Sequence, residues 1–139
     1  MNLRAIDLSS PISKSLLKSE IRSKNAPAPI GPYSQGVIAG AIYCSGQIGI
    51  DPRTGNLEEG VVAQTRRALT NLREVLEAAG MDLGDIVKAT VFMVDLGEYA
   101  QMNEEYGRHF AAPFPSRSTV QVAGLPKGGR VEIDAIAVR

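Results

Sequence analysis

The stretch from Gly60 to Ala79 constrains the fold of this 139-residue chain more than any other. Its apolar residues recur at helical spacing, at Val62, Leu69, Leu72, Val75, Leu76 and Ala79. Glu58 and Glu59 precede it, where acidic residues favour the positive end of a helix, and Gly80 follows it as a stop signal. The pattern predicts a long amphipathic helix, whose apolar face must pack against a second layer of structure.

Strand-like segments lie on both sides of this helix. Two apolar runs around Ala39 and Gly40 indicate a hairpin. The segment 85–94 is rich in β-branched residues and is apolar on both faces apart from Lys88 and Thr90, which predicts a central strand. Further strands are expected near Glu20 to Ser23, over 117–123 and over 131–138.

A second helix is expected after the central strand. Asp95 and Glu98 form a D-x-x-E pattern that predicts a capping box at its start. Its buried stripe is expected at Tyr99, Met102, Tyr106 and Phe110. Two helices on one face of a mixed sheet make an α+β two-layer sandwich. Too little chain remains to cover the other sheet face, so we expect a homo-oligomer.

Composition argues against several classes of protein. Basic and acidic residues balance at 15 each, so no bulk charge attracts nucleic acid or an anionic membrane. No apolar run approaches the roughly 18 residues that span a bilayer. One cysteine, Cys44, and one histidine, His109, cannot build a zinc site. Cys44 is expected to be a core thiol, and His109 a surface or capping residue at a helix end.

Arg117, Glu132 and Asp134 raise a question, because they lie on the two closing strands, which are expected to be neighbours. A guanidinium that faces the protein interior needs a partner. Two interpretations stay open on spacing alone. Arg117 forms a structural ion pair with one of the two acids, or it binds the carboxylate of a ligand. In the second case Glu132 is a candidate general acid or base, or a group that positions water.

Six segments of the chain resemble the RidA family (formerly YjgF), the reactive-intermediate deaminases. They are, in order, "APAPIGPYSQG", "YCSGQIGIDPRTG", "ALTNLREVLEAAG", "GDIVKATVFMVDL", "MNEEYGRHF" and "PSRSTVQVAGLPKGGRVEIDAIAV". The resemblance implies a chorismate-mutase-like fold, assembled as a homotrimer with its sites in the clefts between subunits. It also implies hydrolysis of 2-imino acids or their enamine tautomers, such as 2-iminobutanoate and 2-aminoacrylate, to 2-keto acids and ammonia. This reaction protects pyridoxal-phosphate enzymes.

The resemblance implies a role for particular residues. Arg117 binds the substrate carboxylate, Glu132 holds and polarises the attacking water, and Tyr33 closes the pocket. The other pocket residues that it implies are Ser45, Gly46, Asn103 and Thr119. Many bacterial members have cysteine where this chain has Thr119, and Asp134 is interpreted as structural. A protonated imine is already electrophilic, so no metal or cofactor is expected.

Two other functions stay open beside the deaminase. A regulatory trimer that binds small carboxylates without turnover would use Arg117 in the same way. A ribonuclease or translation-inhibitor role has been described for family members. Zero net charge, a single histidine and the lack of a basic and aromatic stripe make that role the weakest of the three.

The resemblance divides the chain into an extension over 1–19 and a single domain over 20–139. A mitochondrial or plastid targeting role for the extension is one interpretation, but Asp7 and Glu20 count against a presequence and favour a cytoplasmic protein. Ser10 followed by Pro11 predicts the start of a short helix in the extension.

Overall fold

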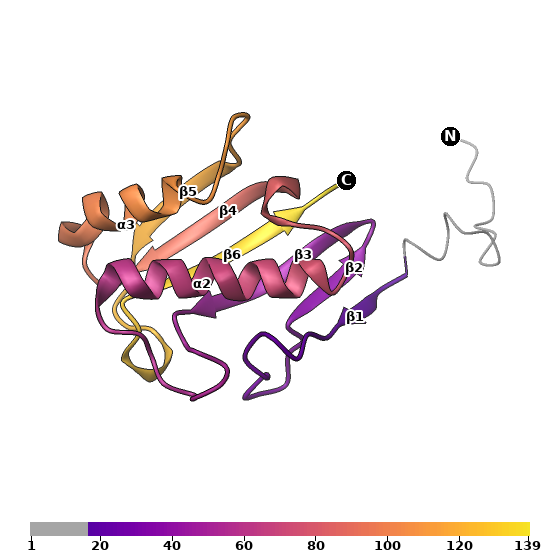
Figure 1. The fold of residues 1–139 in the computed structure, drawn as a ribbon, viewed down its shortest axis with the longest axis horizontal. Helices are drawn as coiled ribbons and strands as arrows, with labels where there is room; N and C mark the ends of the chain where they lie inside the picture. The colour runs from indigo at the N-terminus through magenta and orange to yellow at the C-terminus, as the bar shows by residue number, and fades with distance from the viewer. Residues whose placement is uncertain (1–16) are drawn as a thin grey trace.

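The computed structural model describes residues 17–139, which form a six-stranded sheet with two α-helices on one face (Figure 1). The helices are α2 (Gly60–Glu77) and α3 (Tyr99–Gly107). The strands are β1 (Ser19–Ile21), β2 (Gly36–Ala39), β3 (Ala41–Ile48), β4 (Ile86–Met93), β5 (Ser116–Gln121) and β6 (Val131–Ala137). The predicted element order and the α+β class are confirmed. The helix start expected at Ser10 lies outside the described residues.

The strand order in the sheet is β1-β2-β3-β6-β4-β5, and only β4 and β5 are parallel. Parallel neighbours need a crossover connection, which α3 supplies here. The crossover carries β5 to the outer edge of the sheet, and β6 pairs with both β3 and β4. The expectation that the two closing strands are neighbours is therefore wrong, because β4 lies between them.

Helix α2 packs its apolar face against β3 and β6. The predicted residues Leu69, Leu72, Val75 and Leu76 are fully buried. Val62 was expected in the same stripe but is 36% exposed, and its neighbour Val61 is buried instead. The helix begins at Gly60, and its buried face follows positions 61, 65, 68 and 72 at helical spacing. Val62 lies next to this face and not on it.

Contacts with α2 also fix the chain where β3 ends. The side-chain amide of Asn71 donates hydrogen bonds to the carbonyls of Ile48 (3.3 Å) and Ile50 (2.9 Å). Gly49, between these two residues, approaches the backbone of Gln64 so closely that a Cβ would overlap it. This anchoring positions the segment after β3, which forms part of the cavity described below.

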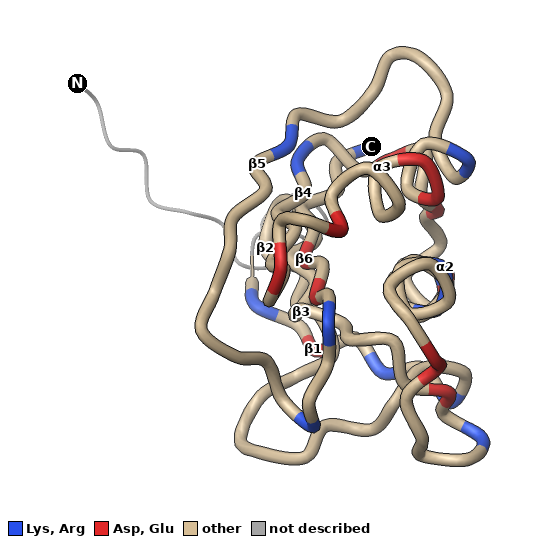
Figure 2. Tube along the Cα trace, turned by 90° about the vertical axis from the view of Figure 1, so that its left-hand side faces the viewer, with Lys and Arg blue, Asp and Glu red and all other residues tan. Residues whose placement is uncertain are grey.

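The two faces of the sheet differ. Alternate residues of β6 are buried in the core on the helix side, namely Val131, Ile133, Ala135 and Ala137. Strand alternation therefore puts Glu132 and Asp134 on the opposite face. Figure 2 shows α2 and α3 on one side of the strands only, and among residues 17–139 no helix covers the other side. Exposed apolar side chains such as Tyr43 and Val120 lie on that open face.

The start of α3 differs in detail from the prediction. Asp95 accepts a hydrogen bond from the amide two residues on, but Glu98 binds Arg130 (2.6 Å) instead of returning to close the box. A reciprocal capping box lies earlier, at Asp82 and Asp85. Within the predicted stripe Met102 and Tyr106 are buried, Phe110 follows the helix end, and Tyr99 is 40% exposed. The expectation for Tyr99 was wrong.

The single cysteine and the single histidine have structural surroundings. Cys44 is buried, and this burial, with the nearby Asp134 carboxylate, raises the thiol pKa to about 12, so it is a core thiol as predicted. His109 follows the end of α3, and its Nε2 lies 3.1 Å from Glu105 Oε1. None of the helices in the described part of the chain is long and apolar enough to cross a bilayer.

Candidate functional site

The Pro- and Gly-rich loop over 25–36 is shaped by one buried side chain, that of Gln35. Its amide oxygen accepts a hydrogen bond from the Ser23 amide (2.7 Å), and its amide nitrogen donates to the Pro27 carbonyl (2.9 Å). These bonds satisfy backbone groups that have no strand partner. They hold an irregular loop, and with it Tyr33, in a defined place.

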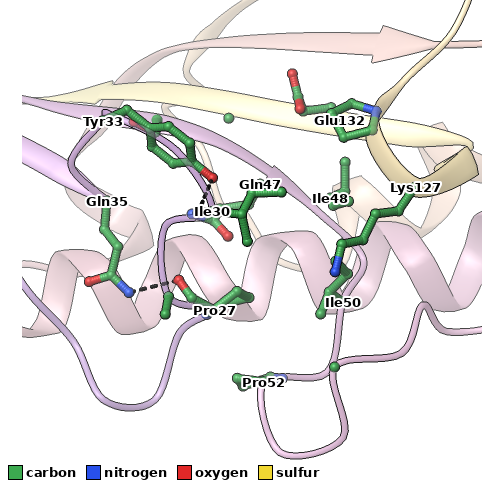
Figure 3. Close-up of a pocket in the computed structure, with 15 residues that line it drawn as sticks. Pro27, Ile30, Tyr33, Gln35, Gln47, Ile48, Ile50, Pro52, Lys127 and Glu132 are labelled. Carbon is green, nitrogen blue, oxygen red and sulfur yellow. Dashed lines mark hydrogen bonds between the residues drawn. The ribbon is translucent and has the colours of Figure 1, made fainter.

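This loop, the end of β3 and β6 enclose a cavity of about 490 Å³ (Figure 3). Four predicted site residues line it, namely Tyr33, Ser45, Gly46 and Glu132. Most of the other lining residues are apolar, including Ile30, Ile48 and Ile50, while Gln35 and Gln47 are polar and Lys127 adds a cation. A mostly apolar cavity of this size with a few polar groups is typical of a small-molecule site. We call it the Glu132 cavity.

Glu132 is the acid of this cavity. Burial, and to a lesser degree the charge of Asp134, raises the pKa of its carboxyl group above the ordinary value of 4.5. No hydrogen-bond donor within residues 17–139 satisfies this carboxylate. A Cβ on Gly46 would come within 2.8 Å of the carboxyl carbon and of Oε2. Glycine at position 46 therefore lets the carboxylate lie directly against the β3 backbone.

The hydroxyl groups of Tyr33 and Ser45 differ in what they can offer a ligand. Tyr33 is half exposed, and its hydroxyl oxygen accepts a hydrogen bond from the Ile30 amide (3.2 Å). Its own proton therefore remains available. The Ser45 hydroxyl donates its proton to the Ser34 carbonyl (2.5 Å), so it can only accept from a ligand.

Arg117 lies on β5, and its side chain faces α3. Its Nη2 donates to Tyr99 Oη and to Asn103 Oδ1, each at 2.7 Å. The guanidinium also lies over the Tyr106 ring, 4.6 Å from its centroid. Thr119, two residues further along the same strand, faces the same side. We call these five residues the Arg117 cluster.

The interpretation that Arg117 pairs with Glu132 or Asp134 of its own chain is wrong. Within residues 17–139 its guanidinium pairs with no carboxylate. Glu132 and Asp134 lie on the other face of the sheet, with β4 between the two strands. A guanidinium with only neutral partners can receive an anion.

Two buried polar atoms of the Arg117 cluster have no hydrogen-bond partner in the described part of the chain, the Tyr106 hydroxyl and Thr119 Oγ1. Burial raises the Tyr106 pKa, and the charge of Arg117 opposes that rise. Leaving such atoms unsatisfied costs about 1–3 kcal/mol each. Unsatisfied polar atoms beside a free cation are typical of a binding surface.

The predicted site residues thus fall into two groups that a single chain does not bring together. Sequence reasoning missed Tyr99 and Tyr106, which it assigned to the core. Their signal was present, because Tyr99, Asn103 and Tyr106 follow one helix face at spacings of four and three. Within residues 17–139, no group of three or more His, Cys, Asp and Glu side chains is placed to hold a metal ion.

Comparisons with known proteins agree on one family. The family model described as endoribonuclease L-PSP matches residues 23–139. The chain is 50% identical over 127 residues to the goat (Capra hircus) 2-iminobutanoate/2-iminopropanoate deaminase, covering 90% of this chain and 93% of that protein. It is also 50% identical to the Salmonella typhimurium protein of the same name, with 88% and 99% covered. The crystal structure of E. coli TdcF with bound serine has a TM-score of 0.83 at 46% identity and covers 87% of this chain and 98% of that one.

Proposed function

The chain belongs to the endoribonuclease L-PSP family, which includes the RidA (YjgF) proteins, and from this premise we propose that it is a 2-iminobutanoate/2-iminopropanoate deaminase. It hydrolyses reactive 2-imino acids and their enamine tautomers to 2-keto acids and ammonia. The observation that carries the proposal is the presence of an unpaired guanidinium, Arg117, and an unpaired carboxyl of raised pKa, Glu132. The reaction needs one to hold the substrate and the other to handle protons.

Arg117 binds the substrate carboxylate in this proposal. Asn103 and Thr119 lie beside it and complete the polar surroundings of the bound carboxylate. The serine bound in the related E. coli TdcF structure is an amino-acid-sized carboxylate, which agrees with a substrate of this class. Fixing the substrate in one orientation supplies part of the rate increase.

Glu132 handles the water. Its carboxylate accepts a proton as the water oxygen bonds to the imine carbon, and the product is a carbinolamine. That proton is then delivered to nitrogen. As the carbon–nitrogen bond breaks, the Glu132 carboxylate takes the proton of the carbinolamine hydroxyl, which leaves the 2-keto acid, and this last proton departs with ammonia as ammonium. The raised pKa makes the carboxyl group a better proton acceptor than an ordinary glutamate, and the proton that it accepts is the one that it later donates. Tyr33 donates its hydroxyl proton into the cavity, Ser45 accepts from a ligand, and Gly46 keeps the carboxylate against β3.

A homotrimer with its sites between subunits would join the two groups of residues. One subunit would supply the Arg117 cluster at the outer edge of its sheet, and the next would supply the Glu132 cavity. The open sheet face, with exposed apolar residues such as Tyr43, favours such an assembly. The chorismate-mutase-like arrangement proposed for the family is consistent with this two-layer fold.

A coupled assay tests the activity. A dehydratase generates 2-iminobutanoate in the cuvette, semicarbazide traps the residual imine, and the wild type is compared with Arg117→Ala. We expect the wild type to accelerate release of 2-oxobutanoate and Arg117→Ala to lose this acceleration. No acceleration by the wild type with several imino acids would refute the deaminase and favour a regulatory protein that only binds carboxylates.

Mixing two inactive variants tests the placement of the site. Arg117→Ala and Glu132→Gln are unfolded together and refolded as a mixture. If neighbouring subunits share each site, random assembly restores an intact site in about one quarter of cases. If both groups act within one subunit, the mixture stays inactive.

RNA cleavage, which the family description suggests, receives no support from the site. The only histidine of the chain is bonded to Glu105, and the net charge is zero.

A further inference from the structure

The Nη2 nitrogen of Arg117 carries two hydrogens, and each has a partner. One is donated to Tyr99 Oη and the other to Asn103 Oδ1, both at 2.7 Å. Both hydrogen bonds with good distances and angles thus use Nη2, and Nη1 and Nε make none within residues 17–139, although the guanidinium lies close to Tyr106. One edge of the guanidinium is therefore occupied by the protein itself.

This occupation matters because a carboxylate is gripped best by two parallel N–H bonds. The planar guanidinium offers two such forks, Nη1 with Nη2 and Nε with Nη2, and both use Nη2. A carboxylate cannot take either fork while Tyr99 and Asn103 keep both Nη2 hydrogens. One of these two acceptors must release Arg117 when a carboxylate binds.

The two acceptors differ in chemistry. The amide oxygen of Asn103 can only accept, so Asn103 can bind a carboxylate oxygen only after its amide turns over to present the nitrogen. The phenol of Tyr99 both accepts and donates. No residue in the described range accepts the Tyr99 proton, and its side chain is 40% exposed at the sheet edge. The hydroxyl can therefore give up the Arg117 bond and donate its own proton to the arriving carboxylate.

We propose that Tyr99 is a substrate-binding residue of the carboxylate subsite, whose hydroxyl accepts from Arg117 in the empty site and donates to the substrate carboxylate in the filled one. The proposal rests on the proposed function and adds a residue to it. Tyr99 neither gives nor takes a proton in the reaction, and it makes the subsite selective for a carboxylate.

The position of Tyr99 is well fixed for this role. It lies at the start of α3, one helical turn before Asn103. The helix is tied to α2 through the buried Glu105, which accepts a hydrogen bond from Arg66 Nε at 2.9 Å. The Tyr106 ring lies against Arg117 from the same helix. A hydroxyl held this way loses little freedom when it binds a ligand.

The test compares wild type with Tyr99→Phe, which removes the hydroxyl and keeps the ring. Binding of 2-oxobutanoate, the stable keto acid, is measured by titration calorimetry, and the uncharged 2-oxobutanamide serves as the reference ligand. Turnover of 2-iminobutanoate is measured in parallel. Thr70→Val is the control, because it also removes one hydroxyl, which lies on α2 and bonds only the Arg66 carbonyl.

We expect Tyr99→Phe to bind 2-oxobutanoate about three- to tenfold more weakly, since a hydrogen bond to a charged group is lost and the freed Nη2 hydrogen recovers part of it. KM should rise by a similar factor with kcat nearly unchanged, and 2-oxobutanamide binding should not change. If Tyr99 merely supported the fold, its substitution would change the affinities for both ligands and kcat together.

Unchanged or tighter 2-oxobutanoate binding by Tyr99→Phe would overturn the inference. Arg117 would then bind the carboxylate through two N–H bonds without help from the Tyr99 hydroxyl. Failure of the wild type to bind 2-oxobutanoate at all would overturn it as well. If the wild type binds 2-oxobutanoate but turns over no imine, the proposed function fails, and the calorimetric comparison still decides the role of Tyr99.

Discussion

The Glu132 cavity and the Arg117 cluster hold their charged groups in opposite ways. Glu132 lies half-buried beside apolar side chains with no hydrogen-bond donor among residues 17–139, and its pKa is raised. Arg117 lies at a sheet edge with two hydrogen-bond acceptors and an aromatic ring around it. The acid is poorly solvated and responsive to pH, whereas the cation is well supported and permanently charged.

This difference indicates a division of labour. A permanently charged, well-positioned group is suited to holding a carboxylate, and a carboxyl group of raised pKa is suited to moving protons. Within residues 17–139 of a single chain, neither group forms an ion pair with an opposite charge. Residues kept in this state at two places are expected to be functional rather than structural, because neutral side chains would be less costly there.

The sharpest way to break the comparison is Glu132→Gln, which keeps the shape and removes the proton acceptor. We expect turnover of 2-iminobutanoate to fall by roughly 10²- to 10⁴-fold. Binding of 2-oxobutanoate should stay within a factor of about three, because the carboxylate is held by Arg117. The coupled assay and calorimetry measure the two effects. Equal losses of binding and turnover would show that substrate binding and proton transfer are not assigned to separate groups.

Gly46→Ala tests the close packing of the cavity. The added methyl carbon would lie 2.8 Å from the carboxyl carbon and Oε2 of Glu132, so the acid must move. A displacement of this kind should lower kcat by about tenfold or more. Gly124→Ala is the control, since no atom lies within 4 Å of a Cβ there. Full activity in Gly46→Ala would mean that the position of the carboxylate is not critical.

The pH profile should respond to Asp134. Glu132 must be ionised to accept a proton, so kcat/KM should fall as pH decreases through its pKa, which lies above 4.5. The charge of Asp134 contributes to this raised pKa, after burial. Asp134→Asn should therefore move the acid limb of the profile to lower pH, whereas Glu77→Gln, at the far end of α2, should not move it. If Asp134→Asn leaves the acid limb of the profile unchanged, that limb reports the titration of a group other than Glu132.

The raised pKa of Glu132 also affects the stability of the fold. As pH rises, the free energy of unfolding should fall, whereas kcat/KM should rise. Between 4.5 and the raised pKa of Glu132 the folded chain binds more protons than the unfolded chain. The contribution of Glu132 to the free energy of unfolding is thus fully present below 4.5 and is lost as pH rises through the raised value. The ionised form of Glu132 that the proposed reaction needs is thus the form that opposes folding.

Much of the fold could be predicted from the sequence because its signals are local. Three elements depend on spacing within one segment and are confirmed, namely the α2 helix with its buried stripe apart from Val62, the hairpin at Gly40 and the β-branched β4. The insertion of β6 between β3 and β4 depends on which strands pair across the whole chain. Nothing in the order of strands along the sequence contains that information.

The site was predictable only in part, for the same reason. The residue types were visible, but the sequence placed Arg117 and Glu132 together, and the fold separates them by a strand and by a face of the sheet. Tyr99 read as a core residue because helical spacing does not say which end of a stripe reaches solvent. Only the packing of α3 against β5 shows that its hydroxyl meets Arg117.

The smallest effect that we expect concerns backbone strain, and it again separates the two regions. Lys127, which lines the Glu132 cavity, has φ of 56°, the only positive value at a non-glycine residue within 17–139. The left-handed conformation costs such a residue about 1–2 kcal/mol, whereas glycine adopts it freely but loses about 0.5–1 kcal/mol more in chain entropy on folding.

Lys127→Gly should therefore be more stable than Lys127→Ala by about 0.5–1 kcal/mol, because alanine keeps the strain and glycine removes it. Urea unfolding of the two variants measures this difference, and the comparison cancels the loss of the lysine side chain, which both share. Equal stability, or a less stable glycine variant, would mean that the strain at position 127 does not exceed the entropy cost of glycine, about 0.5–1 kcal/mol. A more stable glycine variant would locate strain in the cavity region, whereas the Arg117 cluster consists of residues with ordinary backbone conformations.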